Sequence, residues 1–185
     1  VHNLTLSFDP DMRRGLAAGN TLILRCVDVS EEELVAVLVH ELGHVVDTGL
    51  LQESTTDEIT SFVDRGQIVY SSDPSSFLYS VSWEDNSSLK SDLSNPDFIS
   101  GYAMTSPYEE FAETYAANVL HGPLFRFYAA HNSTLAKKYE YFKEVVFDGV
   151  EFDFASEDLP GIREAKSRTY DITRLDYDLE LFLAL

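Results

Sequence analysis

Residues 30–49 read SEEELVAVLVHELGHVVDTG, and they show the start, the periodicity and the end of a helix. Ser30 and the three glutamates after it have the pattern of a capping box, with Ser30 as the N-cap and Glu33 at the third helical position. The glutamates also complement the positive end of a helix dipole. Apolar residues then recur with helical spacing as far as Gly49, a residue typical of a helix end. The stretch therefore predicts a helix, and this helix carries two histidines four positions apart.

The two histidines belong to the pattern HELGH at residues 40–44. Side chains at positions i and i+4 lie on one face of a helix, so His40 and His44 can bind one zinc ion together. Glu41 lies beside them, where it can act as a general base towards a zinc-bound water. The alternative is an ordinary buried helix whose histidines only take part in packing. The motif favours the zinc site.

A catalytic zinc ion needs a third protein ligand. An extended HExxHxxGxxH motif is absent, because Asp47 and Leu50 stand where it requires glycine and histidine. The segment EEFAE at residues 109–113 offers carboxylates instead, and Glu109 and Glu113 share one face of a predicted helix. One of the two can bind the metal while the other accepts the free N–H of a histidine ligand. A solvated acidic helix face is the alternative.

These motifs, together with Tyr102, resemble the catalytic domain of anthrax lethal factor and its relatives, which include the secreted Pro-Pro endopeptidases, all of the gluzincin type. The resemblance rests on HELGHVVD at residues 40–47 and EEFAE at residues 109–113, and it covers roughly residues 20–120. It implies a zincin-like metallopeptidase fold, a zinc cofactor, and hydrolysis of peptide bonds in a protein or peptide substrate. It selects Glu109 as the third zinc ligand and implies that Tyr102, seven residues earlier, stabilises the oxyanion.

Two further acids and one glycine are candidates to support this site. Glu113 is expected to accept a hydrogen bond from a histidine ligand. Asp47, one turn beyond His44, is expected either to orient an imidazole or to cap the end of the helix. Gly43 is expected either to let a neighbouring element approach the helix closely or to be a tolerated helix glycine.

The rest of the chain predicts an α+β fold, with a small N-terminal sheet followed by a mostly helical part that includes the HExxH helix. Strands are expected at residues 4–8, half-buried, and at 21–27. Further helices are expected at residues 57–69, 74–83, 106–122, 123–131 and 133–147, with a loop at 86–95. We expect a single zincin-like domain over residues 1–185, with an insertion within residues 50–100 because the two motifs are further apart than the resemblance implies.

Composition excludes several classes of function. The chain has 185 residues, with 13 Lys+Arg against 32 Asp+Glu and a formal charge of −19, so nucleic acid is not an expected partner. No apolar run approaches the roughly 20 residues that span a bilayer. The single cysteine, Cys26, can form neither an intramolecular disulfide nor a Cys-rich zinc site. The charge also predicts that neutral or basic peptides are captured faster than acidic ones.

The sequence leaves three functions to compare. The first is a zinc metalloendopeptidase, with an extracellular location because the similar proteins are secreted. The second is a catalytically inactive zincin-fold module for binding or regulation, and the third is a structural domain without metal. The complete set of base, ligands and tyrosine favours the enzyme. Substrate specificity and oligomeric state are left open.

Overall fold

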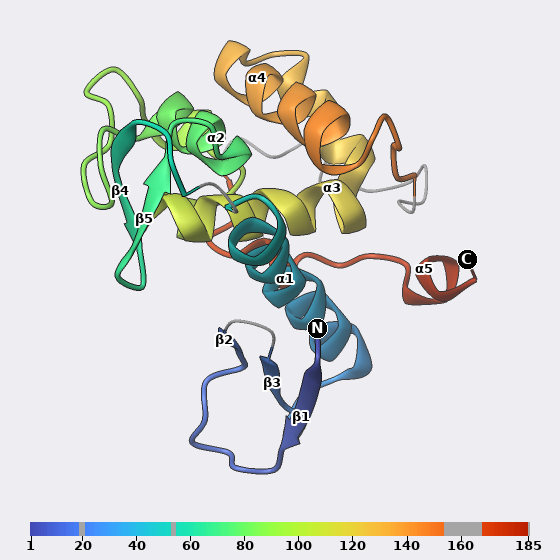
Figure 1. The fold of residues 1–185 in the computed structure, drawn as a ribbon. Helices are drawn as coiled ribbons and strands as arrows, with labels where there is room; N and C mark the ends of the chain where they lie inside the picture. The colour runs from blue at the N-terminus through green and yellow to red at the C-terminus, as the bar shows by residue number, and fades with distance from the viewer. Residues whose placement is uncertain (19–20, 53–54, 154–167, 185) are drawn as a thin grey trace.

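The computed structural model describes residues 1–18, 21–52, 55–153 and 168–184, and it places a small sheet before a set of helices (Figure 1). The sheet consists of β1 (Asn3–Ser7), β2 (Gly15–Ala18) and β3 (Thr21–Arg25), in the order β1-β3-β2. Strand β1 runs parallel to β3, and β2 runs antiparallel to it. This arrangement agrees with the expected small N-terminal sheet followed by helices.

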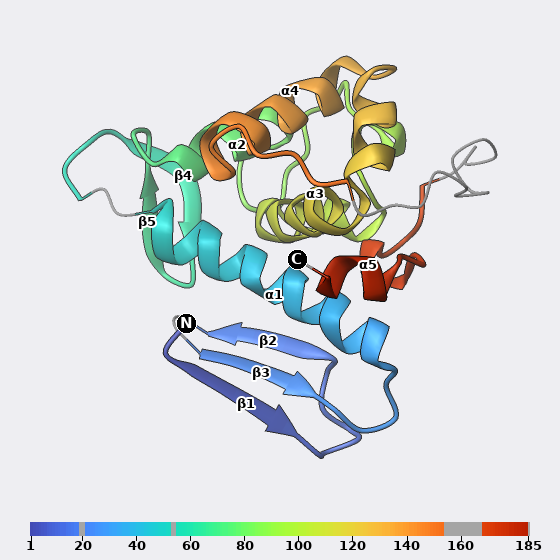
Figure 2. The ribbon, with the colours of Figure 1, turned by 90° about the vertical axis from the view of Figure 1, so that its right-hand side faces the viewer.

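Helix α1 (Glu31–Leu50) is the central element (Figure 2). The sheet lies on one side of it, and α3 (Pro107–Ala129) lies on the other. Helices α2 (Pro74–Ser82) and α4 (Ser133–Tyr141) contact α3. The remaining elements are the hairpin strands β4 (Ile59–Asp64) and β5 (Gln67–Tyr70), 3-10 turns at residues 95–97, 102–104 and 172–174, a π-helical turn at 142–146, and α5 (Leu179–Leu183).

The helices predicted at residues 30–49 and 74–83 are confirmed as α1 and α2. Ser30 is the N-cap of α1, and its side chain accepts a hydrogen bond from the backbone N–H of Glu33 at 3.1 Å. Helix α3 begins after Ser106 as predicted, but it does not end at Gly122. The expected separate helix at residues 123–131 is the continuation of α3 beyond a kink at His121 (φ −134°, ψ 36°), which lies two positions before a proline.

The prediction of a helix at residues 57–69 is wrong, because this segment forms the hairpin β4–β5. Several of its residues are β-branched or aromatic and favour strands. The two strands are joined by Arg65 and Gly66, both at positive φ (47° and 86°), which is the conformation of a tight two-residue hairpin turn. The hairpin lies within the expected insertion at residues 50–100.

The strand expected at residues 4–8 is confirmed as β1, but the expectation that it is half-buried is wrong. Leu4 and Leu6 of β1 are 55% and 50% exposed, because β1 is the outer strand of the sheet, away from β2 and α1. Strand β2 has the sequence GLAA and was not predicted, since it shows no alternation of polar and apolar residues.

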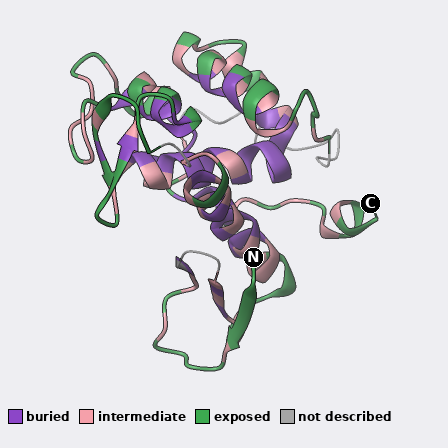
Figure 3. Cartoon of the chain, viewed as in Figure 1, coloured by how far each residue is buried: buried purple, intermediate pink, exposed green. Residues whose placement is uncertain are grey.

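The largest core cluster surrounds α3, whose residues are mostly buried (Figure 3). An ion pair joins Glu110 of α3 to Lys138 of α4, and both side chains are almost fully buried. Glu110 also accepts hydrogen bonds from Ser82 at 2.9 Å and from the indole N–H of Trp83 at 2.6 Å. Buried charges are tolerated when they are paired and hydrogen-bonded, so this network fixes α2 and α4 against α3. None of the described helices is both long and apolar enough to cross a bilayer.

Helices α1 and α3 approach each other closely at Gly43. A Cβ atom on Gly43 would lie 2.9 Å from the Cα of Ala112 and 3.0 Å from the Cβ of Tyr115. The backbone of α3 therefore occupies the space that a side chain at position 43 would need. Of the two expectations for this glycine, the structure confirms the close approach of a neighbouring element.

Replacement of Gly43 by alanine should push the two helices apart. We expect Gly43→Ala to lower the free energy of unfolding by about 1–3 kcal/mol, the usual cost of overpacking, measured by urea denaturation. Gly49→Ala is the matched control at the exposed end of the same helix, and it should leave stability unchanged or raise it by up to about 1 kcal/mol. A Gly43→Ala variant as stable as the wild type would contradict the tight crossing.

Candidate metal centre

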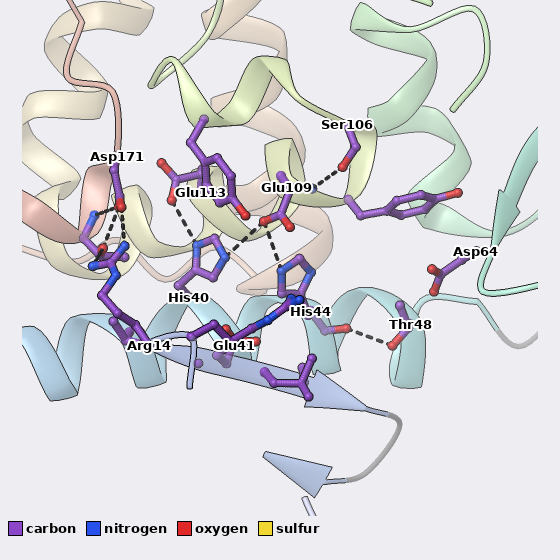
Figure 4. A pocket seen from close by; sticks show the side chains of 18 of the residues that line it. Arg14, His40, Glu41, His44, Thr48, Asp64, Ser106, Glu109, Glu113 and Asp171 are labelled. Atoms are coloured by element: carbon purple, nitrogen blue, oxygen red, sulfur yellow. Dashed lines mark hydrogen bonds and ion pairs between the residues drawn. The ribbon is translucent and has the colours of Figure 1, made fainter. Parts of the chain in front are cut away.

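The two histidines of α1 face the first turn of α3 (Figure 4). Nε2 of His40 and Nε2 of His44 each lie 3.3 Å from Oε2 of Glu109. The start of α3 is fixed by Ser106, whose hydroxyl accepts a hydrogen bond from the backbone N–H of Glu109 at 3.1 Å. The structure thus brings together the three residues expected to bind zinc.

Two of the three spacings among these atoms match the edge of a tetrahedral site. With zinc–ligand distances of about 2.0–2.1 Å, the edge of a tetrahedron is about 3.3 Å. The two nitrogen–oxygen distances are 3.3 Å, and all three ligand atoms lie within 4.8 Å of one another. Oε2 of Glu109 is buried and makes no hydrogen bond within the described part of the chain. A metal ion between the three side chains would satisfy this oxygen, so His40, His44 and Glu109 could hold a metal ion.

In the metal-free site, neighbouring charged groups shift the pKa values of His40 and Glu109 in the direction opposite to burial. Burial lowers the pKa of His40, but Glu109 and Glu113 act more strongly in the opposite direction and raise that pKa to about 10. Burial raises the pKa of Glu109, while contacts with His40 and His44 outweigh it and hold the pKa well below its ordinary value. Without metal, the site therefore holds a proton on His40 at neutral pH.

Glu113 contacts the imidazole of His40 from the side opposite to Glu109. Its Oε1 lies 3.0 Å from Nδ1 of His40, which is the contact expected for it. Its Oε2 accepts hydrogen bonds from the hydroxyl of Ser100 and from the backbone N–H of Ile172 at 2.9 Å. Because the carboxylate is fully buried and held from several sides, it fixes the orientation of the His40 ring.

The three glutamates of the EEFAE segment point to different partners. Glu109 faces both imidazoles, Glu113 contacts His40, and Glu110 belongs to the buried ion pair with Lys138. The resemblance selects Glu109 as the ligand, and Glu109 is the one that lies within ligand distance of both histidines.

Asp47 does not contact the imidazoles. Its buried carboxylate accepts a hydrogen bond from the hydroxyl of Tyr79 at 2.5 Å and another from Gln52 at 3.4 Å. Burial raises the pKa of Asp47 to about 7, although these hydrogen bonds oppose the shift. The side chain thus connects the last turns of α1 to α2, and among the described residues no hydrogen bond joins it to a histidine.

Glu41 and Tyr102 line the same cleft as the histidines, which has a volume of about 910 Å³. Gly15 of β2 approaches Glu41 so closely that a Cβ atom there would lie 2.7 Å from its Cγ. The ring of Tyr102 stacks with that of His40, with 6.1 Å between centroids. Burial, together with Glu109, raises the pKa of the Tyr102 hydroxyl, so it stays protonated and can donate a hydrogen bond.

Sequence reasoning missed the contribution of the C-terminal segment. Besides Ile172, which binds Glu113, the backbone oxygen of Tyr170 accepts a hydrogen bond from the N–H of Tyr102 at 2.6 Å. Asp171 forms an ion pair with Arg14, which precedes β2. These partners lie far apart in the chain, and no local pattern in the sequence marks them.

Comparisons with known proteins assign neither a family nor a function to the chain. The sequence matches no protein-family model and no curated protein, and no solved structure is similar to it. The conclusions about this site therefore rest on its own residues and geometry.

Zinc binding should release a proton from His40. A raised pKa means that the metal-free protein keeps this proton between pH 6.5 and about 10, whereas zinc binds the neutral ring. At pH 7–9 we expect a release of about one proton per zinc from this group, seen by titration calorimetry as an enthalpy that depends on the buffer. Glu113→Gln removes one charge that holds the proton and should reduce the release. A buffer-independent enthalpy at pH 7 would contradict this assignment.

Proposed function

We propose that this protein is a zinc-dependent metalloendopeptidase with a zincin-like fold. The observation that carries the proposal is the convergence of His40, His44 and Glu109, whose ligand atoms lie within 4.8 Å of one another, beside Glu41 and Tyr102. The order of the motifs supports it, since it resembles that of the lethal factor relatives. A catalytically inactive module would not need a general base, three metal ligands and a tyrosine together in one cleft, so their presence favours the enzyme.

Each residue has a role that follows from its chemistry. Bound zinc would lower the pKa of a water ligand towards about 7 and polarise the scissile carbonyl. Glu41 accepts the proton of the attacking water and then donates it to the leaving amine. Tyr102 donates a hydrogen bond to the oxygen that becomes negative. Glu113 keeps His40 in the tautomer that presents Nε2 to the metal.

Strand β2 offers a backbone edge for an extended substrate. The N–H of Arg25 donates to the carbonyl of Arg14 at 2.9 Å, which sets the antiparallel register of β2 with β3. Backbone groups alternate in direction along such a strand, so those of Gly15 and Ala17 point away from β3. Both residues line the cleft. A peptide that pairs with this edge would pass the metal site as an added strand.

Replacement of the base gives the sharpest test of catalysis. We expect Glu41→Gln to bind about one zinc per chain and to fold normally, but to lose cleavage of a quenched-fluorescent peptide library. Zinc is measured by elemental analysis and folding by circular dichroism. Cleavage retained by Glu41→Gln would contradict the role of Glu41. Zinc bound by a wild-type protein that cleaves no peptide would instead favour the inactive module, and absence of zinc after zinc-replete purification would favour the structural domain.

Removal of the Tyr102 hydroxyl should affect kcat. We expect Tyr102→Phe to lower kcat about 100-fold, the usual effect of losing one donor to the oxyanion, with little change in zinc content. Tyr177→Phe is the matched control, because the Tyr177 hydroxyl donates to the backbone oxygen of Glu32 near the start of α1, outside the cleft. An equal loss of activity in both variants would indicate a general effect on structure.

A further inference from the structure

One backbone carbonyl on the outward edge of β2 already accepts a hydrogen bond from another part of the chain. The guanidinium group of Arg65 donates a hydrogen bond to the carbonyl oxygen of Ala17 at 2.5 Å. This carbonyl is one of the groups that point away from β3, as the register of the strand requires. Arg65 therefore holds an acceptor that an added peptide strand would need.

Arg65 reaches β2 from the tip of the β4–β5 hairpin. Figure 2 shows this tip directed towards the sheet. Both residues of the turn, Arg65 and Gly66, have positive φ, and the turn joins the paired residues Asp64 and Gln67. Such a two-residue turn has a defined conformation, so it presents the Arg65 side chain in a fixed direction.

The hairpin is braced against the helices next to the metal centre. Asn86 accepts a hydrogen bond from the N–H of Val63 at 3.0 Å and donates one to the Val63 carbonyl at 2.7 Å. The hydroxyl of Tyr108 donates to the same Asn86 side chain at 2.9 Å. Tyr108 precedes Glu109 in α3, so the hairpin is held in a fixed relation to the metal ligands.

The hairpin closes one end of the cleft. Val63, Asp64 and Arg65 line it together with Thr48, one turn beyond His44 on α1. The opposite end is lined by Arg14 and Asp171, near His40 (Figure 4). An extended peptide lying along β2 must therefore meet Arg65 as it leaves the site, whereas a ligand bound at the metal alone need not.

We propose that Arg65 is a specificity-determining latch, which must leave the carbonyl of Ala17 before an extended peptide can pair with the full length of β2. This inference rests on the proposed function of the cleft. Arg65 is an exposed residue, although its hydrogen bond to Ala17 is partly buried, and the net contribution of one such hydrogen bond is small enough for a substrate to displace it. The latch disfavours long peptides relative to short ones, and a substrate that offers Arg65 a replacement acceptor overcomes it.

The test compares ligands that do and do not reach Ala17. The probes are acetohydroxamate, which binds zinc alone, and two tetraalanine hydroxamates with the zinc-binding group at opposite ends. Each is titrated by calorimetry into the zinc-loaded wild type and Arg65→Ala. The peptides carry neutral side chains, so a change in charge attraction contributes little. Both Arg and Ala carry a Cβ atom, so the substitution leaves the backbone preference of the turn nearly unchanged.

We expect Arg65→Ala to bind one of the tetraalanine hydroxamates about threefold to tenfold more tightly than the wild type, with acetohydroxamate unchanged. Lys137→Ala removes an exposed positive charge on α4, outside the cleft, and should change no affinity. Equal or weaker binding of both tetraalanine ligands by Arg65→Ala would overturn the latch. Failure of acetohydroxamate to bind the wild type would overturn the zinc proposal itself, and the latch with it.

Discussion

The contact between Gly43 of α1 and Ala112 of α3 is the constraint on which the site depends. Gly43 lies three positions after His40 and one before His44, and Ala112 has the same offsets from Glu109 and Glu113. The crossing point thus falls within both pairs of side chains. Because the backbones nearly touch there, the two histidines and the two glutamates must face one another. A larger residue at either position would separate the side chains that could hold a metal ion together.

The crossing of α1 and α3 also buries carboxylates, whose charges the surrounding residues stabilise. It brings several carboxylates into or near the core, and each is stable there because it has a partner. Glu110 pairs with Lys138, while Glu113 receives hydrogen bonds from Ser100 and Ile172 and contacts His40. Glu109 has a buried oxygen, Oε2, that lies 3.3 Å from both imidazoles. Of the three acids, Glu109 is the one that lies near both histidines, where it could hold a metal ion with them.

The parts of the site that could be predicted from sequence are those set by helical periodicity. His40 and His44, like Glu109 and Glu113, are neighbours on a helix face whatever the rest of the chain does. The partners that complete the cleft follow no such rule, since 157 positions separate Arg14 from Asp171 and 48 separate Ala17 from Arg65. Asp47 shows the limit within a helix: its spacing from His44 is suitable, but Tyr79, on another helix, takes its hydrogen bond. The hairpin was mistaken for a helix because a two-residue turn at positive φ is a weak signal when its first residue is arginine.

Net charge and the cleft act on a substrate at different ranges. The charge of −19 acts over about a Debye length, roughly 8–10 Å, and so influences how often peptides of either sign reach the cleft. Within the cleft, Arg14 is paired with Asp171, and Arg65 holds the carbonyl of Ala17. Both arginines are therefore engaged before a ligand arrives, but only the charge of Arg14 is balanced by a carboxylate. If the proposed function holds, capture of peptides should follow the net charge, whereas the choice among them should follow from which can displace Arg65 and pair with β2.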